Sequence, residues 1–77
     1  MTLDTLKVGH SGIIKAVGGH ESLRRRLLDM GLTPGTEIRV CKMAPLGDPI
    51  EIYLRGYFLT IRKADARQLD ITEVFET

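Results

Sequence analysis

Apolar and polar residues alternate along most of this 77-residue chain with the period of two that is typical of β-strands. Glycine and proline residues divide the alternating stretches at roughly even intervals. In the first stretch, burial of both Ile14 and Val17 would require a bulge near Lys15, because strict alternation places them on opposite faces. The pattern predicts a mainly β fold, a small barrel of about five strands. The predicted strands cover residues 11–17, 36–43, 50–54, 57–62 and 70–75.

One segment departs from this period. Over residues 21–30 the apolar positions recur about every 3.6 residues, which predicts one short helix inserted between the first two strands. Gly31 lies where a left-handed residue often ends a helix, and Pro34 follows where a helix cannot resume. Leu28 projects well away from the apolar stripe, so we expect it to be exposed. The stripe itself is formed by Leu23, Leu27 and Met30.

The dipeptide Arg55-Gly56 separates two strands by the length of a two-residue hairpin turn. This turn would place Tyr53 opposite Phe58 on one face of the hairpin. That aromatic pair is either a binding platform or is covered by the N-terminal arm. Beyond the hairpin, residues 63–69 are long enough for one helical turn. On the other face we expect core pairs of Ile50 with Ile61, Ile52 with Leu59, and Leu54 with Tyr57.

Residues 44–49 interrupt the alternation with two prolines and a glycine. Proline lacks an amide donor and glycine permits unusual backbone angles, so we expect a rigid, exposed loop here. Leu46 and Asp48 stand near its tip. A rigid loop loses little conformational entropy on binding, which makes this tip a reasonable place for contact with another protein.

Length and composition limit the functions that this chain can have. Its 77 residues fit one domain, residues 1–77, and leave no room for a second hydrophobic core. A net charge of +1 provides no strong field to attract nucleic acid. No stretch approaches the ~20 apolar residues of a membrane span, and no N-terminal signal segment is recognisable. Together with a single cysteine, these features indicate the cytoplasm.

Catalytic and metal-binding patterns are absent from the sequence. Neither His10 nor His20 stands in a recognisable arrangement with Cys41, so no nucleophile and base are predicted. Close pairs of cysteine or histidine, such as C-x-x-C, do not occur. We therefore expect no enzyme activity, no cofactor and no metal site. Four carboxylates lie in segments that we expect to be solvated, namely Asp29, Asp48, Glu51 and Asp65.

Three sequence blocks span most of the chain. The first reads R-L-x-x-M-G-L-x-P-G and begins at Arg26, within residues 23–35. The second is A-P-L-G-D-P at residues 44–49, and the third is L-x-I-R at the end of the predicted hairpin. Together these blocks resemble the ferrous iron transport protein A (FeoA) family. The resemblance implies an SH3-like barrel with a helix between early strands, in agreement with the order of elements predicted above.

The same resemblance implies a function. It implies a cytoplasmic accessory or regulatory protein of bacterial ferrous iron uptake. Such a protein would act on the membrane transporter, ferrous iron transport protein B (FeoB), whose cytoplasmic portion carries a GTP-binding domain. We expect contact with that partner through Arg25, Leu28, Leu46 and Asp48, without nucleic acid and without insertion into the membrane.

Two other functions remain open at this point. The basic run at residues 24–26 is compatible with a small nucleic-acid-binding barrel, whose affinity would fall steeply with salt. A direct ferrous-iron carrier or sensor could use His20, Glu21 or Asp48 as ligands.

Overall fold

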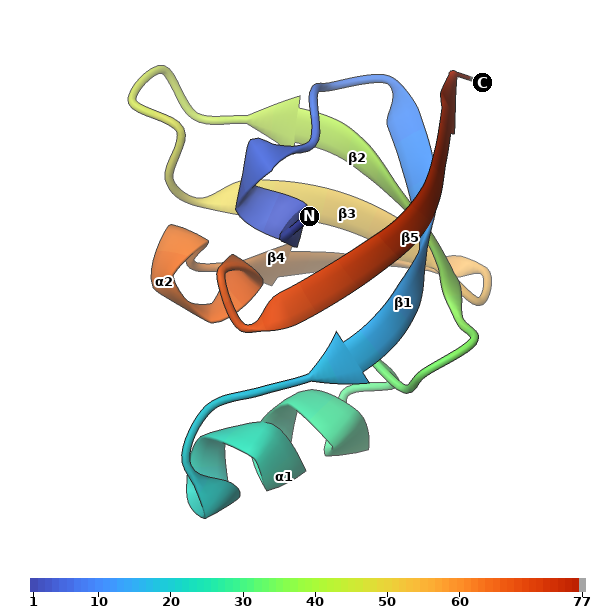
Figure 1. The fold of residues 1–77 in the computed structure, drawn as a ribbon. Helices are drawn as coiled ribbons and strands as arrows, with labels where there is room; N and C mark the ends of the chain where they lie inside the picture. The colour runs from blue at the N-terminus through green and yellow to red at the C-terminus, as the bar shows by residue number, and fades with distance from the viewer. Residues whose placement is uncertain (77) are drawn as a thin grey trace.

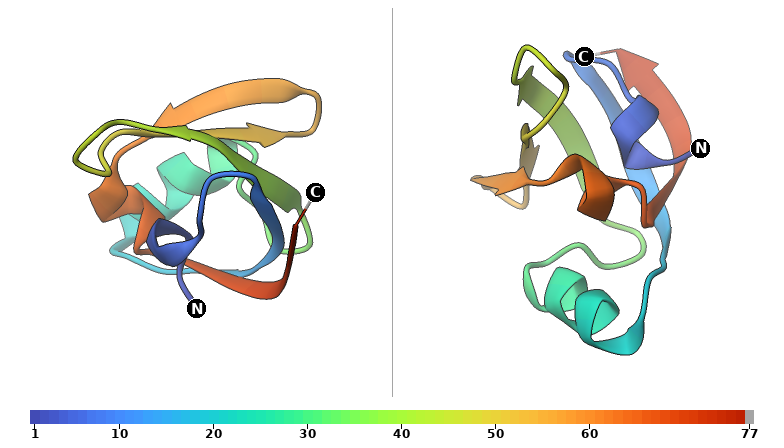
Figure 2. Two further views of the ribbon diagram at one scale, coloured as in Figure 1. Left: turned by 90° about the horizontal axis from the view of Figure 1, so that it is seen from above. Right: turned by 90° about the vertical axis from the view of Figure 1, so that its left-hand side faces the viewer.

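One antiparallel sheet forms the body of the molecule (Figure 1). The computed structural model describes residues 1–76. The sheet curls around a single core, which is evident in the end-on view of Figure 2. The predicted mainly β fold and its five strands are confirmed. In the order in which they are hydrogen-bonded, the strands are β4 (Tyr57–Ile61), β3 (Ile50–Leu54), β2 (Glu37–Met43), β1 (His10–Val17) and β5 (Leu69–Glu76).

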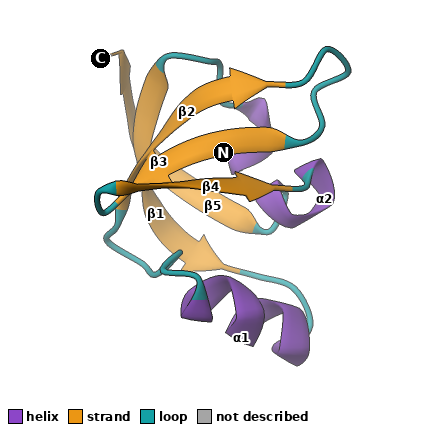
Figure 3. Cartoon of the chain, turned by 180° about the vertical axis from the view of Figure 1, so that it is seen from behind, coloured by secondary structure: helices purple, strands orange, loops and turns teal. Residues whose placement is uncertain are grey.

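Two short helices connect strands, and a 3₁₀ segment precedes the first strand (Figure 3). Helix α1 (Glu21–Asp29) lies between β1 and β2, as the sequence predicts, and Met30 is its C-cap. Helix α2 (Lys63–Ala66) is the expected single turn between β4 and β5. The 3₁₀ segment η1 (Leu3–Thr5) near the N-terminus is an element that the periodicity does not predict.

The turn after α1 fixes where the helix ends. Gly31 has a φ of 97°, in the left-handed region that glycine adopts without steric cost. Its amide donates to the carbonyl of Leu28 at 3.0 Å, and the amide of Leu32 donates to the carbonyl of Leu27 at 3.1 Å. These two bonds form a Schellman motif, in which the residues at its two ends pack together. Leu27 and Leu32 are accordingly both fully buried.

Leu28 is not the exposed residue that the helical pattern predicts. It is half-buried and packs against the core. The prediction is wrong because the chain reverses immediately after α1, so apolar contact covers a wider arc of the helix than the stripe through Leu27.

β1 contains the predicted irregularity. Its register against β5 shifts between Ile14 and Ala16, and Ile14 and Val17 are both buried. The expectation of a bulge near Lys15 is therefore confirmed. Bulges of this kind increase the local twist, which helps a long strand to curl around a small core.

The β3–β4 hairpin has the predicted register, from Leu54 opposite Tyr57 to Ile50 opposite Ile61. Both turn residues have positive φ, 47° at Arg55 and 86° at Gly56, as in a type I′ turn. The expected aliphatic face is buried except at Leu59, which is half-buried, and at its turn end. There the side chain of Tyr57 is 38% exposed, and its hydroxyl donates to the carbonyl of Met30.

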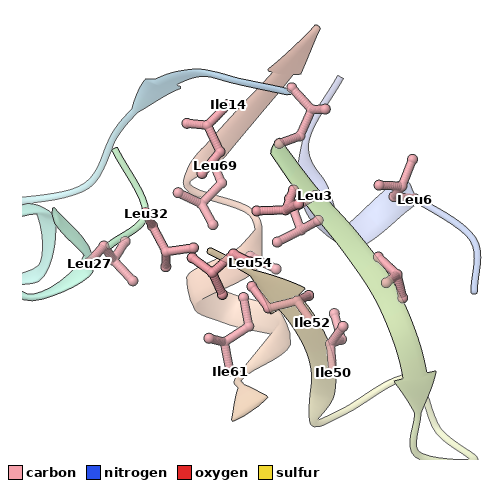
Figure 4. Packing of buried hydrophobic residues seen from close by; sticks show 14 of the residues in the cluster. Leu3, Leu6, Ile14, Leu27, Leu32, Ile50, Ile52, Leu54, Ile61 and Leu69 are labelled. Carbon is pink, nitrogen blue, oxygen red and sulfur yellow. The ribbon is translucent and has the colours of Figure 1, made fainter. Parts of the chain in front are cut away.

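The core is aliphatic, and Figure 4 shows how its side chains meet between the sheet and the short helices. Leu3 and Leu6 from the N-terminal segment belong to it, although the sequence analysis places neither of them there. Its buried hydrophobic residues are Leu3, Leu6, Ile14, Val17, Leu27, Leu32, Ile38, Val40, Ile50, Ile52, Leu54, Ile61, Ala66, Leu69 and Ile71.

Candidate functional site

The loop at residues 44–49 projects from the end of the barrel between β2 and β3 (Figure 1). Leu46 at its tip is 91% exposed, the most exposed large apolar side chain among the described residues. Two backbone hydrogen bonds close the loop, from the amide of Ala44 to the carbonyl of Pro49 (3.1 Å) and from the amide of Gly47 to the carbonyl of Ala44 (2.7 Å). The expected exposure of the loop is therefore confirmed, and the structure adds that its own backbone bonds brace it.

Asp48 is exposed and also has a structural contact that the sequence analysis misses. Its Oδ1 accepts a hydrogen bond from the amide of Lys63 at 3.1 Å. Lys63 is the first residue of α2, and the N-cap residue Arg62 offers no side-chain acceptor of its own. Asp48 therefore satisfies an amide that the start of a helix leaves without a partner, and it joins the loop to α2.

A shallow hollow lies at the foot of this loop. Its volume is about 290 Å³, and its wall combines loop residues with the outer face of three strands. It is therefore next to the braced loop and open to a side chain of a neighbouring protein. The residues that line it are Lys42, Met43, Ala44, Pro49, Glu51 and Thr60.

Helix α1 carries the basic run, and its three arginines have different contacts. The Nε of Arg24 donates to the carbonyl of Val17 at 3.2 Å, which ties the helix to the end of β1. Arg26 pairs with Asp65 of α2 at 3.3 Å. The carboxylate of Asp65 is only 15% exposed, so the expectation that it is a solvated charge is wrong.

Arg25 is the arginine that points into solvent. Its side chain is 74% exposed and lies 3.6 Å from the carboxylate of Glu21, one helical turn earlier. An exposed pair of this kind contributes little to stability. Arg25 is therefore available for contact with a partner.

The four predicted contact residues do not form one surface. Leu46 and Asp48 lie on the loop, whereas Arg25 and Leu28 lie on α1, at the opposite end of the barrel (Figures 1 and 3, and the right panel of Figure 2). A single small partner segment would reach one end or the other. The loop end is the more exposed of the two, because Leu28 is packed against the core.

The outer face of the β3–β4 hairpin carries an aromatic pair. The rings of Tyr53 and Phe58 meet edge to face, with centroids 5.0 Å apart and an interplanar angle of 62°. Their exposed fractions are 40% and 63%. Of the two alternatives left by the sequence, coverage by the N-terminal arm is excluded, since both rings remain accessible.

The contacts of His20 and the burial of Cys41 indicate structural roles for both residues. The Nδ1 of His20 accepts a hydrogen bond from the amide of Leu23 at 3.2 Å and so caps the start of α1. Cys41 is half-buried on β2. Across the described part of the chain, no three histidine, cysteine or acidic side chains gather closely enough to hold a metal ion. None of the described helices has the length and apolar character of a bilayer span.

Comparison with known proteins identifies the family. Residues 1–73 match the FeoA domain. A curated relative from Porphyromonas gingivalis, an Fe(2+) transport protein A/Fe(2+) transporter FeoB fusion protein, is 34% identical over 71 residues. That match covers 92% of this chain and 8% of the relative, so the chain spans a small part of the fusion protein.

Solved structures of similar proteins have the same fold as this chain. The FeoA protein of Chlorobium tepidum is 39% identical, with a TM-score of 0.84 over 92% of this chain and 68% of its own. The zinc complex of Stenotrophomonas maltophilia FeoA, described as a prokaryotic SH3 domain protein, superposes with a TM-score of 0.81 at 24% identity over 94% of this chain and 89% of its own. The fold is therefore the SH3-like barrel that the resemblance implies, and the chain belongs to the FeoA domain family.

Proposed function

We propose that this chain is a cytoplasmic accessory protein of bacterial ferrous iron uptake that regulates the FeoB transporter by protein–protein contact. The observation that carries this proposal is the Porphyromonas gingivalis relative, in which the matching segment and a FeoB transporter are parts of one polypeptide. Covalent linkage holds two domains at a high effective concentration, which favours a contact that separate chains make by association. The target of contact is the GTP-binding portion of the transporter.

The loop at residues 44–49 is the main contact in this proposal. Burial of a leucine side chain such as Leu46 contributes about 1.5–3 kcal/mol. Because backbone hydrogen bonds already brace the loop, binding costs little conformational entropy there, and little of the free energy from burying Leu46 is lost. The hollow beside the loop offers a place for an apolar side chain of the transporter. Asp48 adds a negative charge close to the same tip.

Arg25 and the accessible part of Leu28 form a second, smaller contact on α1 in this proposal. The loop and α1 lie at opposite ends of the barrel (Figure 2, right panel). Both contacts therefore form together only with a partner that is large enough to reach both ends of the domain. Arg24 and Arg26 already bind groups within the chain, which favours a protein contact through Arg25 over a nucleic-acid surface built from the whole basic run. The protein acts by binding and performs no catalysis itself.

The test is a pull-down of this chain with the isolated GTP-binding domain of FeoB, with and without guanine nucleotide. Leu46→Glu should reduce the retained fraction about tenfold, because a carboxylate replaces an apolar side chain at the interface. Leu46→Met is the matched control, since it keeps an apolar side chain of similar size, and it should bind like the parent. Equal binding by the parent and Leu46→Glu would contradict the proposed contact. No association in any nucleotide state would contradict the proposed partner.

A further inference from the structure

Strand β4 is an edge of the sheet, and its outer side is open. It pairs with β3 alone, and no backbone group of β4 bonds to any other described residue. The hairpin turn determines which groups face outward. In a two-residue turn the flanking pair, Leu54 and Tyr57, is hydrogen-bonded, and hydrogen-bonded pairs then alternate with non-bonded ones. The N–H and C=O groups of Phe58 and Thr60 therefore point away from β3, toward solvent.

Aromatic side chains gather along this edge. Both tyrosines of the chain and one of its two phenylalanines lie on the β3–β4 hairpin, and all three are exposed. Among residues 1–72, for which burial is described, no aromatic side chain is buried. Aromatic residues are enriched at protein interfaces, where they bury large areas with few rotatable bonds. Their placement on this hairpin, and not in the core, indicates a surface used for contact.

The charged residues at the two ends of β4 are basic, although Glu37 and Glu51 also lie on the outer face of the neighbouring strands. Arg39 lies beside Tyr53 in the register, and Arg55 and Arg62 flank the two ends of β4. None of these three arginines forms an ion pair with a described residue. Arg55 donates to the hydroxyl groups of Thr33 at 2.9 Å and Thr36 at 2.7 Å, which are neutral and leave its charge uncompensated. The acidic residue of β3, Glu51, lies opposite Lys42 of β2. The two ends of the open edge therefore carry positive charge, at Arg55 and Arg62.

This charge pattern discriminates between two possible occupants. A second copy of the chain, paired antiparallel through β4 about Leu59, would bring the end that carries Arg55 against the end that carries Arg62. Like charges that face each other across strands are destabilising. An extended segment with acidic residues at its ends would instead complement both arginines.

We infer that the open edge of β4 binds an acidic, extended segment of another protein by strand addition. Such a segment bonds to the outward backbone groups of Phe58 and Thr60, packs apolar side chains on the Tyr53–Phe58 pair and places carboxylates near Arg55 and Arg62. This edge adjoins the hollow at the foot of the loop at residues 44–49, because Thr60 also lines that hollow. The inference does not depend on the identity of the partner proposed above.

The experiment uses the whole chain and a synthetic peptide of alternating valine and threonine with glutamates at both ends. Binding is followed by NMR, with a matched peptide that has lysines at its ends. The glutamate peptide should protect the amides of Phe58 and Thr60 from hydrogen exchange and should bind about tenfold more tightly than the lysine peptide at low salt. Absence of protection at these two amides, or equal binding of the two peptides, would overturn the inference.

Substitution at Thr60 separates strand addition from adhesion to the aromatic rings. Thr60→Pro removes an outward amide at an exposed edge position, where proline is tolerated, and should weaken binding about tenfold. Thr60→Val keeps the amide and should bind like the parent. Equal affinity of the two variants would overturn the inference, and if Thr60→Pro fails to fold, the exchange measurement on the parent chain decides. Dimerisation of the parent chain through β4, detected by light scattering and by protection without peptide, would likewise overturn it.

Discussion

The two edge strands of the sheet, β5 and β4, differ in how their outer sides are covered. At β5, the N-terminal segment covers the start of the strand. Thr2 forms a bridge with Asp70, the amide of Ile71 donates to the carbonyl of Met1 at 2.6 Å, and Leu3 enters the core beneath. At β4, the outward backbone groups meet no described residue, and the neighbouring side chains are aromatic and exposed.

Exposed sheet edges are templates for unwanted pairing, and natural proteins usually protect them. This chain protects the β5 edge with its own N-terminal segment, so its fold is able to cover an edge strand. The open edge at β4 is bordered by arginines, which oppose pairing of two copies and leave pairing with an acidic strand possible. The contrast therefore indicates that β5 has a structural role and β4 a binding role.

Leu3→Ala should have the largest effect, because it removes the side chain that anchors the covering segment. Leu3 is fully buried in the core. Truncation of a buried leucine to alanine costs about 2–5 kcal/mol, and we expect a loss of that size in the free energy of unfolding, measured by denaturant titration. In the same variant, hydrogen exchange at the amide of Ile71 should become faster, because this amide donates to the carbonyl of Met1 in the covering segment.

Phe58→Ala at the open edge is the matched comparison for this loss. Phe58 is 63% exposed, so its truncation should cost about 1 kcal/mol or less. Comparable losses for Leu3→Ala and Phe58→Ala would contradict the division into a structural edge and a binding edge.

Gly31→Ala should have the next largest effect, at the junction between α1 and the first residue of β4. The φ of Gly31 is 97°, and a new Cβ there would meet the hydroxyl of Tyr57. Left-handed backbone alone costs about 1–2 kcal/mol in a residue with a side chain, and the crowding adds to it. We expect a loss of about 2–3 kcal/mol in the free energy of unfolding.

A double-mutant cycle separates the two contributions. In a Tyr57→Phe background the hydroxyl is absent, so Gly31→Ala should cost less than in the parent, with the backbone strain remaining. An equal cost of Gly31→Ala in both backgrounds would show that Tyr57 does not crowd this turn.

The periodicity of the sequence predicts the barrel well, because alternation and turn chemistry are local. The register of the β3–β4 hairpin follows from Arg55-Gly56 alone, and the bulge near Lys15 follows from the need to bury Ile14 and Val17. The N-terminal segment is different. Leu3 is buried through contacts with strands that lie far away in the sequence, and no local pattern records such contacts.

The candidate site is less predictable for the same reason. The exposure of Leu46 follows from the composition of its loop and is confirmed. Leu28 is wrongly expected to be exposed, because the helical wheel ignores the reversal of the chain at Gly31. Asp48 has its partner on α2, and Asp65 lies on α2 and pairs with Arg26 of α1. The sequence indicates α2 only by its length.

Asp48→Ala tests the connection between the loop and α2, which follows β4. Loss of the acceptor for the amide of Lys63 should lower the free energy of unfolding by about 1 kcal/mol, as for the removal of a helix cap. Asp48→Asn retains an acceptor oxygen and should lose less than half of that amount. The measurement is denaturant titration of both variants. If Asp48→Ala is as stable as the parent, the loop is braced by its own backbone bonds alone.

Asp70→Asn should have the smallest effect, although it acts on the covered edge. The carboxylate lies 3.3 Å from the N-terminal ammonium group of Met1, and the two groups are 44% and 40% exposed. Exposed ion pairs contribute about 0–1 kcal/mol and are screened by salt, so in the chain that retains Met1 the loss should be small at low salt and should vanish in molar salt. Denaturant titrations at two salt concentrations measure it. A loss that persists in molar salt would mean that Asp70 stabilises this edge by more than a screened charge, through the hydrogen bond that its Oδ1 accepts from the ammonium group of Met1.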